Sequence, residues 1–293
     1  MAPSHFALLC PLASALLYVI GALLLRRAAD FGVGFWRTTF VANVICAVAF
    51  SFLWTFGGTF HLRLLWQPAI VAMLFLVGSV LNFISLDKGD VSLATPVLGI
   101  KIVLVAAFVA AVTGEWGKPS VWLAAVLSTA AVALLNWTRA AHHHHVTLTI
   151  LAAGGSAASF ALFDVFVQQW AAAWGVGRFP PTMLAFVALF SCGTIPQFPA
   201  PLSKIAGPAW PWLIGGSLVL AAQALLFISS VAYFRNAAAA NVVYSSRGLW
   251  SVALVWLIGH WFGNRERHLG AAILRWRLIG AVLMLAAIGL VLV

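Results

Sequence analysis

The stretch "VSLATPVLGIKIVLVAAFVAAV", Val91 to Val112, decides the fold class of this chain. It is apolar apart from a few small or proline residues, and it is long enough to cross a hydrocarbon layer about 30 Å thick. Its single charged residue is Lys101. A cation at the centre of a bilayer costs about 2.5 to 3.5 kcal/mol on insertion scales. The stretch therefore predicts a transmembrane helix whose one charge needs a partner or a function.

Apolar segments of this kind recur along the whole chain. Of its 293 residues, 63% are hydrophobic and 8% are charged, and this much apolar surface needs a lipid environment. We expect an all-α polytopic membrane protein that has the bilayer as a partner and lacks a sizeable soluble domain. The first apolar segment is read as a helix and not as a signal peptide, because no Lys or Arg precedes it. Ten transmembrane helices are predicted, at about 5–26, 35–56, 68–86, 91–113, 119–137, 147–171, 180–198, 210–233, 238–262 and 270–293.

Composition and missing motifs exclude several functions. The net charge is +10, but most basic residues stand singly or in pairs beside predicted helices, where anionic lipid headgroups lie. We therefore predict no nucleic-acid binding. No nucleophile motif, HExxH sequence or phosphate-binding loop appears, so we predict that the chain is not an enzyme and uses no cofactor. The run His142 to His145 lacks the ligand spacing of a closed metal site, and no metal is predicted.

Short sequence words recur at a nearly constant distance. "FGVG" at Phe31 to Gly34 is followed 143 residues later by "WGVG" at Trp174 to Gly177, and "FIS" at Phe83 to Ser85 recurs 144 residues later. Each match is weak alone, and the common order and offset give them weight. The chain is therefore predicted to contain an internal duplication.

The repeat divides the chain into two five-helix halves, residues 1–141 and 142–293. Because five is odd, the second half must enter the membrane from the opposite side, which gives two inverted repeats. This architecture suits alternating access, in which a shared central site opens first to one side and then to the other.

The repeat offset also relates the two intramembrane cations. Moving Lys101 forward by 146 residues reaches Arg247, in "NVVYSSRGLWSVALVW". One interpretation is that both cations face a central polar cavity and attract an anionic group of the substrate. The other is structural: either cation snorkels to an interface or pairs with Asp164 in the sixth helix. The sequence leaves both interpretations open.

Further polar residues accompany the two cations. Asn241 and Tyr244 precede Arg247 by three or more residues and can share its helix face. Asp164 is the only acid deep in a predicted helix and is the candidate for proton coupling. Pro96 removes a backbone donor and is predicted to kink the fourth helix just before Lys101.

The segment "GDVSLATPVLGIKIVLVAAFVAAVTGE", Gly89 to Glu115, together with ten helices in a five-plus-five duplication, resembles the EamA-type members of the drug/metabolite transporter superfamily. In that pattern the fourth helix begins with a small-residue and proline region and ends in a Gly-Glu pair, here Gly114 and Glu115. The second copy matches more loosely, at "GNRE", Gly263 to Glu266. The resemblance implies a central substrate site, coupling by alternating access and, for a bacterial relative, a multi-pass protein of the inner (plasma) membrane. The helices that the resemblance places around this site include Tyr18, Asn82, Lys101, Asp164, Gln223, Tyr244 and Arg247. With Asn241, which can share the helix face of Arg247, all of these except Asp164 are the predicted substrate-binding residues.

The expected function is secondary active transport of a small, anionic organic metabolite, because relatives that carry phosphorylated metabolites also place basic residues in helices four and nine. An exporter of amino acids or amphipathic compounds is the alternative within transport, and a channel or a non-transporting scaffold is the alternative outside it. Segments after odd-numbered helices hold ten Lys or Arg against four after even-numbered ones. The positive-inside rule thus places the termini outside, whereas the resemblance places them in the cytoplasm. Orientation, substrate identity, coupling ion and oligomeric state stay open.

Overall fold

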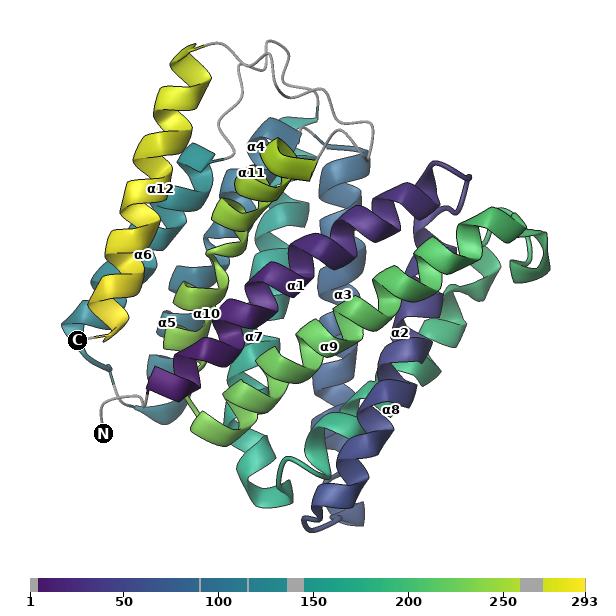
Figure 1. Ribbon diagram of the computed structural model, residues 1–293. Coiled ribbons are helices and arrows are strands. Elements are labelled where there is room, and N and C mark those ends of the chain that lie inside the picture. The colour runs from purple at the N-terminus through teal and green to yellow at the C-terminus, as the bar shows by residue number, and fades with distance from the viewer. Residues whose placement is uncertain (1–4, 90, 115, 136–144, 259–270, 293) are drawn as a thin grey trace. The chain divides into compact units, whose positions relative to one another are not determined.

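The computed structural model describes residues 5–89, 91–114, 116–135, 145–258 and 271–292, and all regular secondary structure in these ranges is helical (Figure 1). Every one of the ten predicted segments is helical in its described part. The α-helices are α1 (His5–Ala29), α2 (Phe35–Ser51), α3 (Trp66–Asp87), α4 (Val91–Gly99), α5 (Lys101–Thr113), α6 (Pro119–Leu135), α7 (Val146–Trp174), α8 (Phe179–Ser191), α9 (Trp210–Phe234), α10 (Ala237–Tyr244), α11 (Arg247–Ile258) and α12 (Ala271–Leu292). The short 3-10 helices are η1 (Phe52–Phe56), η2 (Leu62–Leu64), η3 (Cys192–Gln197), η4 (Leu202–Lys204) and η5 (Gly207–Ala209). Glu115, His142 to His144 and the segment Gly263 to Glu266 lie outside the described residues.

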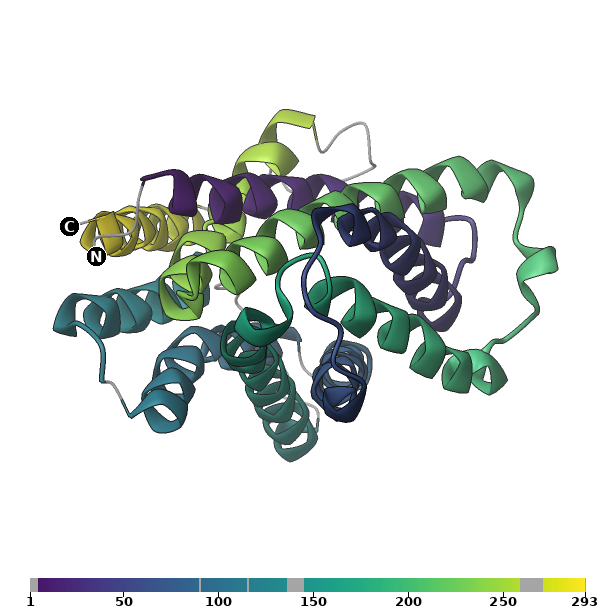
Figure 2. The same ribbon diagram turned by 90° about the horizontal axis from the view of Figure 1, so that it is seen from below.

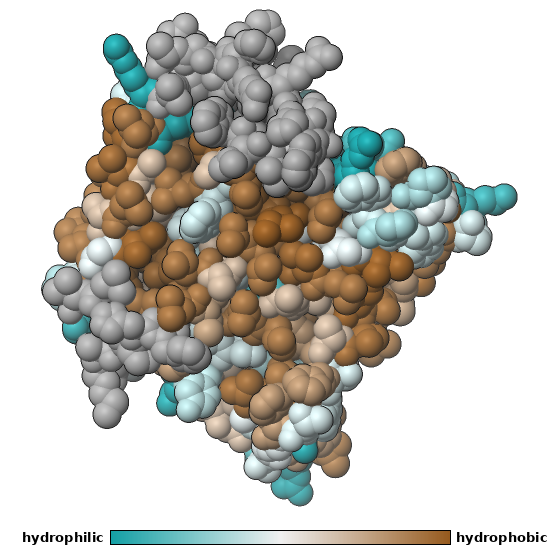
Figure 3. Space-filling model, in the orientation of Figure 1, coloured by the Kyte–Doolittle hydropathy of each residue, from teal (hydrophilic) through white to brown (hydrophobic). Residues whose placement is uncertain are grey.

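Seven helical stretches in the described ranges are long and apolar enough to cross a membrane. Their outer faces are apolar as well: Val48, Leu151 and Val126 are examples of large hydrophobic side chains that are more than half exposed. The face seen in Figure 3 is mostly hydrophobic, and hydrophilic residues gather toward its edges. Exposed apolar surface of this extent fits a chain whose solvent is lipid.

Two of the predicted helices are interrupted in the middle. The fourth breaks at Ile100, between α4 and α5, and the ninth breaks at Ser245 and Ser246, between α10 and α11. The backbone stays right-handed at both breaks but tightens, because Ile100 N–H bonds to the Val97 carbonyl and Ser246 N–H bonds to the Val243 carbonyl, each at 3.1 Å. A short 3-10 tightening inside a helix is a common place for a hinge.

The two breaks have different local causes. The first follows Pro96, which lacks the backbone N–H of a regular helical turn. The second has no proline; instead the Ser245 hydroxyl donates to the Val242 carbonyl at 2.5 Å. Back-bonding of a serine to the preceding turn bends helices.

The helices α2 and α8, one from each predicted half, end alike. Each passes directly into a 3-10 helix, η1 after α2 and η3 after α8. In each case the last α-helical residue is a serine whose hydroxyl donates to a carbonyl of the preceding turn: Ser51 to Val48 at 2.6 Å, and Ser191 to Val187 at 2.7 Å.

The chain forms two compact units, each of which takes segments from both predicted halves. The first unit comprises Met1–Leu12, Val77–Val165 and Asn236–Val293, and the second comprises Ala13–Leu76 and Phe166–Arg235. The predicted boundary between the halves, at 141 and 142, falls outside the described residues and stays a prediction.

Each unit is built around one helix that contacts several others. In the first unit α6 packs against α12, where Ala131, Leu135 and Met284 form a buried cluster, and also against α4 and α5 (Figure 1). The helix α10 packs against α5 and α6. In the second unit α2 packs against both α8 and α9 (Figure 2). The packing in the first unit brings α5 and α10 together, and with them the residues described next.

Candidate functional site

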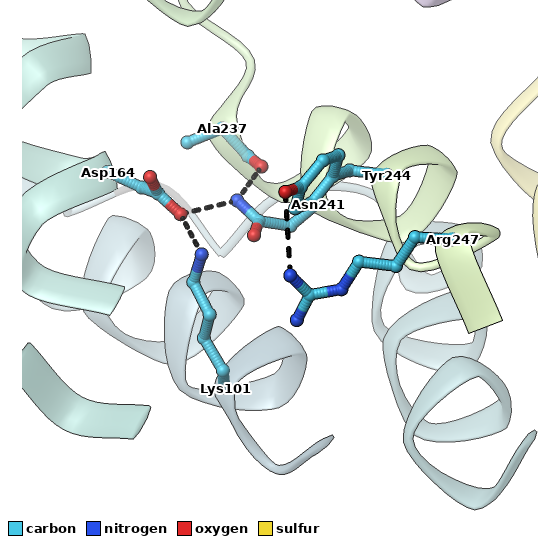
Figure 4. A network of polar contacts seen from close by, with 6 residues as sticks. All are labelled: Lys101, Asp164, Ala237, Asn241, Tyr244 and Arg247. Atoms are coloured by element: carbon cyan, nitrogen blue, oxygen red, sulfur yellow. Dashed lines mark hydrogen bonds and ion pairs between the residues drawn. The ribbon is translucent and has the colours of Figure 1, made fainter. Parts of the chain in front are cut away.

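Lys101 and Asp164 form a buried ion pair inside the first unit. The Lys101 Nζ lies 2.8 Å from Asp164 Oδ2. Lys101 is the first residue of α5, directly after the break at Ile100, and Asp164 comes from α7 (Figure 4). The lysine side chain is 18% exposed and the aspartate side chain only 2%. Of the two roles that the sequence left open for Lys101, the structure thus shows the pairing with Asp164.

Asn241 joins this pair from α10. Its Nδ2 donates to Asp164 Oδ2 at 2.8 Å and to the Ala237 carbonyl, one turn earlier on the same helix, at 2.9 Å (Figure 4). The Asp164 carboxylate therefore accepts from an ammonium and from an amide, which are the contacts that a buried carboxylate requires. Asn241 itself is 3% exposed. Its fixed amide orients the carboxylate toward Lys101.

Tyr244 and Arg247 lie beside the pair, at the second helix break. The Arg247 guanidinium carbon lies 4.9 Å from the centre of the Tyr244 ring, and Nη1 donates a long hydrogen bond of 3.4 Å to the tyrosine hydroxyl. Tyr244 ends α10 and Arg247 begins α11. Figure 4 shows the guanidinium extending toward the side on which Asn241 and Lys101 lie. The arginine is thus held against an aromatic ring, with its charged end directed at the network.

The charges of this group do not balance. With every group ionised, Lys101 and Arg247 supply two positive charges and Asp164 supplies one negative charge. Lys101 also lies 5.9 Å from the centre of the Phe160 ring, a weak cation–π contact from α7 that adds no formal charge. Counted over these three described residues alone, the formal charges sum to one positive charge.

Of the other predicted substrate residues, one lies in the first unit and two lie in the second. Asn82 lies half-buried on α3 in the first unit, where its backbone carbonyl accepts from the Ser85 hydroxyl at 2.8 Å. Tyr18 and Gln223 belong to the second unit. There Gln223 Nε2 donates to Ser14 Oγ at 2.8 Å, so that this glutamine joins α9 to α1. This is the interhelical role that a glutamine in a membrane helix often has.

Sequence reasoning missed two polar groups close to Arg247. The Ser246 Oγ and the Trp250 Nε1 are both buried and have no hydrogen-bond partner in the described part of the chain. The corresponding sequence feature is the triplet "SSR", Ser245 to Arg247, which ends where α11 begins. Its hydropathy does not distinguish it from the rest of a predicted helix. Nothing in the described ranges brings three His, Cys, Asp or Glu side chains together in a way that could hold a metal ion.

Comparison with known proteins supports the fold and does not extend to function. No family model and no curated protein matches the sequence. Among solved structures, one titled "Crystal structure of protein" is similar, with a TM-score of 0.71 and 15% sequence identity over 97% of this chain and 96% of that chain. The fold of this chain is thus shared with a solved structure over nearly the full length of both, at an identity that carries no information on substrate.

Proposed function

We propose that the chain is a ten-span secondary transporter of the EamA type, with two inverted five-helix halves, which moves a small anionic organic metabolite across a bacterial inner membrane by alternating access. The observation that carries the proposal is the buried network of Lys101, Asp164, Asn241 and Arg247, with its one positive charge in excess. Intramembrane ionisable groups are costly, and they are retained mainly where substrates or ions pass.

The two cations hold equivalent places, which supports the proposed duplication. Lys101 and Arg247 are each the first residue of the second helix of an interrupted pair. Discontinuous helices at the centre of inverted repeats are the usual location of transporter binding sites.

A pair of reciprocal contacts inside the second unit supports the duplication independently. A Cβ on Gly34, in the turn before α2, would have Pro199 as its nearest neighbour. A Cβ on Gly177, in the matching turn before α8, would meet the Gly57 carbonyl. Each turn thus faces the segment that follows the other helix, the relation that a two-fold axis between duplicated halves produces.

In the proposed mechanism the substrate competes with Asp164 for Lys101. The carboxylate holds the ammonium at 2.8 Å in the structure. An incoming anion is attracted by Arg247 and by the excess charge, and it takes the place of the carboxylate at Lys101. Asp164, released from the ammonium but still bound to Asn241, then binds a proton, which avoids a second buried negative charge. Transport of the anion would thus be coupled to a proton.

The charge of the network also ranks the alternatives. An amino acid zwitterion brings no net charge and leaves the excess positive charge uncompensated, whereas a monoanion compensates it. Export of amino acids is therefore the second choice among transport functions. A scaffold would bind no small molecule, and a channel would conduct without saturation.

A ligand screen by thermal stabilisation tests the proposal. A ligand that binds only the folded protein raises its apparent melting temperature, so mono- and dicarboxylates, phosphate esters and amino acids are compared. We expect an anion to stabilise the protein and to be taken up saturably by proteoliposomes. In Arg247→Gln the protein should fold and bind that anion roughly ten- to a hundred-fold more weakly, the value of a lost charge-assisted contact. Lys88→Met, which removes an exposed lysine outside the network, is the matched control.

Two outcomes would overturn the proposal. Stabilisation by amino acids with none by anions would favour the exporter. Uptake of the anion by Arg247→Gln at the rate of the unmodified protein would remove the network from the substrate path.

A further inference from the structure

A second buried cation lies outside the network, in the second unit. Arg37 is 6% exposed and is the third residue of α2. Its Nη2 donates to the Gly32 carbonyl at 2.7 Å, while its Nε is buried without a hydrogen-bond partner. In the described ranges no carboxylate lies within ion-pair distance of this guanidinium. The nearest acid along the chain, Asp30, pairs with Arg27 at 3.0 Å.

The location of Arg37 is unfavourable for a cation in two respects. Burial without a counter-charge is costly. The first turn of a helix also carries the positive end of the helix dipole, which disfavours a cation. One anion bound beside Arg37 at the start of α2 would relieve both effects.

The start of α2 lacks a side-chain cap. Gly34 occupies the N-cap position in an extended conformation, φ −69° and ψ 162°, and no side chain caps the helix. The first N–H groups of a helix have no partner within it, and together with the helix dipole they form an anion site. A Cβ on Gly32, where φ is +75°, would meet no atom within 4 Å, and the nearest atom to a Cβ on Gly34 is the Pro199 Cγ at 3.8 Å. The turn is therefore open as well as uncapped.

In the matching turn of the second half, atoms of the protein itself occupy the corresponding space. In "WGVG" a Cβ on Gly177 would overlap the Gly57 carbonyl, and Thr59 N–H donates to the Trp174 carbonyl at 2.9 Å. The adjacent Arg178 donates to the Trp54 carbonyl at 2.8 Å and lies 4.6 Å from the centre of the Trp54 ring. The protein's own residues thus occupy the second turn, whereas they leave the first turn open.

The surroundings of the first turn indicate which anion binds there. Arg26 and Arg27 at the end of α1 and Lys204 in η4 add positive charge, and the packing of Ala28 and Val33 against Ile205 brings the η4 segment to this turn. Phe31 is 37% exposed beside them. Basic residues at the end of membrane helices, with an exposed aromatic ring, are the features that bind anionic lipid headgroups.

We propose that the turn Phe31 to Gly34 and Arg37 bind the phosphate of an anionic phospholipid. The inference rests on the membrane insertion proposed above and is independent of any transported substrate. The phosphate accepts from the Arg37 guanidinium, whose Nε has no hydrogen-bond partner among the described residues, at the positive end of the α2 dipole.

Lipid binding to the purified protein tests this proposal. The protein in neutral detergent is mixed with phosphatidylglycerol, phosphatidylcholine or inorganic phosphate, and bound lipid is counted by native mass spectrometry beside the melting temperature. We expect phosphatidylglycerol to be retained and to raise the melting temperature, with little effect of phosphatidylcholine. Arg37→Gln should weaken the retention of phosphatidylglycerol about tenfold. The matched control Arg178→Gln should leave it unchanged.

A second variant keeps the test valid if Arg37→Gln does not fold. Gly34→Asp supplies a carboxylate at an N-cap position whose backbone conformation suits it. It should raise the melting temperature of the lipid-free protein and abolish the further rise with phosphatidylglycerol. Gly34→Ser, which caps without charge, should preserve the response to lipid.

Three results would overturn the proposal. The first is equal retention of phosphatidylglycerol by Arg37→Gln and the unmodified protein. The second is a full lipid response in Gly34→Asp. The third is an equal rise with inorganic phosphate, which would assign the site to the free ion. Because none of these readouts uses transport, failure here is distinguishable from failure of the transporter proposal.

Discussion

Neutralising the two members of the buried ion pair should have unequal effects on stability. Lys101→Met leaves the Asp164 carboxylate, 2% exposed, without its cation but with its hydrogen bond from Asn241. Asp164→Asn leaves an ammonium that is 18% exposed and is therefore partly hydrated. A fully buried charge without a partner destabilises the folded state more than a partly hydrated charge does. We expect the lysine substitution to cost more free energy of unfolding than the aspartate substitution.

The separation of the charges sets the scale of this effect. Two unit charges 2.8 Å apart attract each other by about 6 kcal/mol at an effective dielectric constant of about 20. Desolvation cancels part of this attraction, and breaking such a pair from one side costs about 3 to 5 kcal/mol. We expect that cost for Lys101→Met and about 1 to 3 kcal/mol for Asp164→Asn, which keeps a hydrogen-bonding side chain for Asn241. The double variant should lose about 2 kcal/mol less than the sum of the two single losses.

Thermal unfolding in detergent measures all three variants, and the 14 tryptophans of the chain provide the signal. Lys88→Met serves as the control for loss of an exposed lysine and should unfold like the unmodified protein. Equal destabilisation by Asp164→Asn and Lys101→Met, or a double variant that loses the sum of the two single losses, would contradict this expectation. In either case the 2.8 Å contact would not hold the fold together.

Two further predictions concern the second unit. Gly177→Ala should destabilise the protein by about 1 to 3 kcal/mol, because its methyl group would overlap the Gly57 carbonyl. Gly34→Ala, the matched change in the first turn, should be tolerated. Equal melting temperatures of the two variants would contradict this difference between the turns. Asn43→Ala should lower the free energy of unfolding by about 0.6 to 1.7 kcal/mol, because the buried Asn43 Nδ2 donates to Ser191 Oγ at 2.8 Å between α2 and α8. An unchanged thermal unfolding curve would show that this hydrogen bond contributes nothing to stability.

The positions of the helices were predictable from the sequence because hydropathy and helix-breaking residues mark them. The predicted segments at 119–137 and 210–233 correspond to α6, Pro119–Leu135, and α9, Trp210–Phe234. Gly114, with φ +74°, ends α5 at the predicted place, and its N–H bonds to the Ala110 carbonyl. These features are local, so a single sequence contains them.

The interior of the candidate site was less predictable because it depends on contacts between distant residues. The sequence named Asp164 as a possible partner of Lys101, but only packing decides between that partner and a cavity. The break near Lys101 was expected from Pro96. The break before Arg247 was not, because it arises from the hydrogen bond of Ser245 to Val242 and not from a helix-breaking residue. Contacts of Tyr18 and Gln223 with the substrate stay a prediction.

The continuity of α7 allows the depth of Asp164 in a bilayer to be estimated. This helix is unbroken from Val146 to Trp174, and at 1.5 Å per residue Asp164 lies about 15 Å along the axis from Trp174. Trp174 packs against Phe60 and His61, and one turn earlier Trp170 packs against the exposed Trp66. Aromatic groups of this kind settle at the headgroup level. With a hydrocarbon layer about 30 Å thick, they would hold Asp164 near the midplane, equally distant from the water on both sides of the membrane.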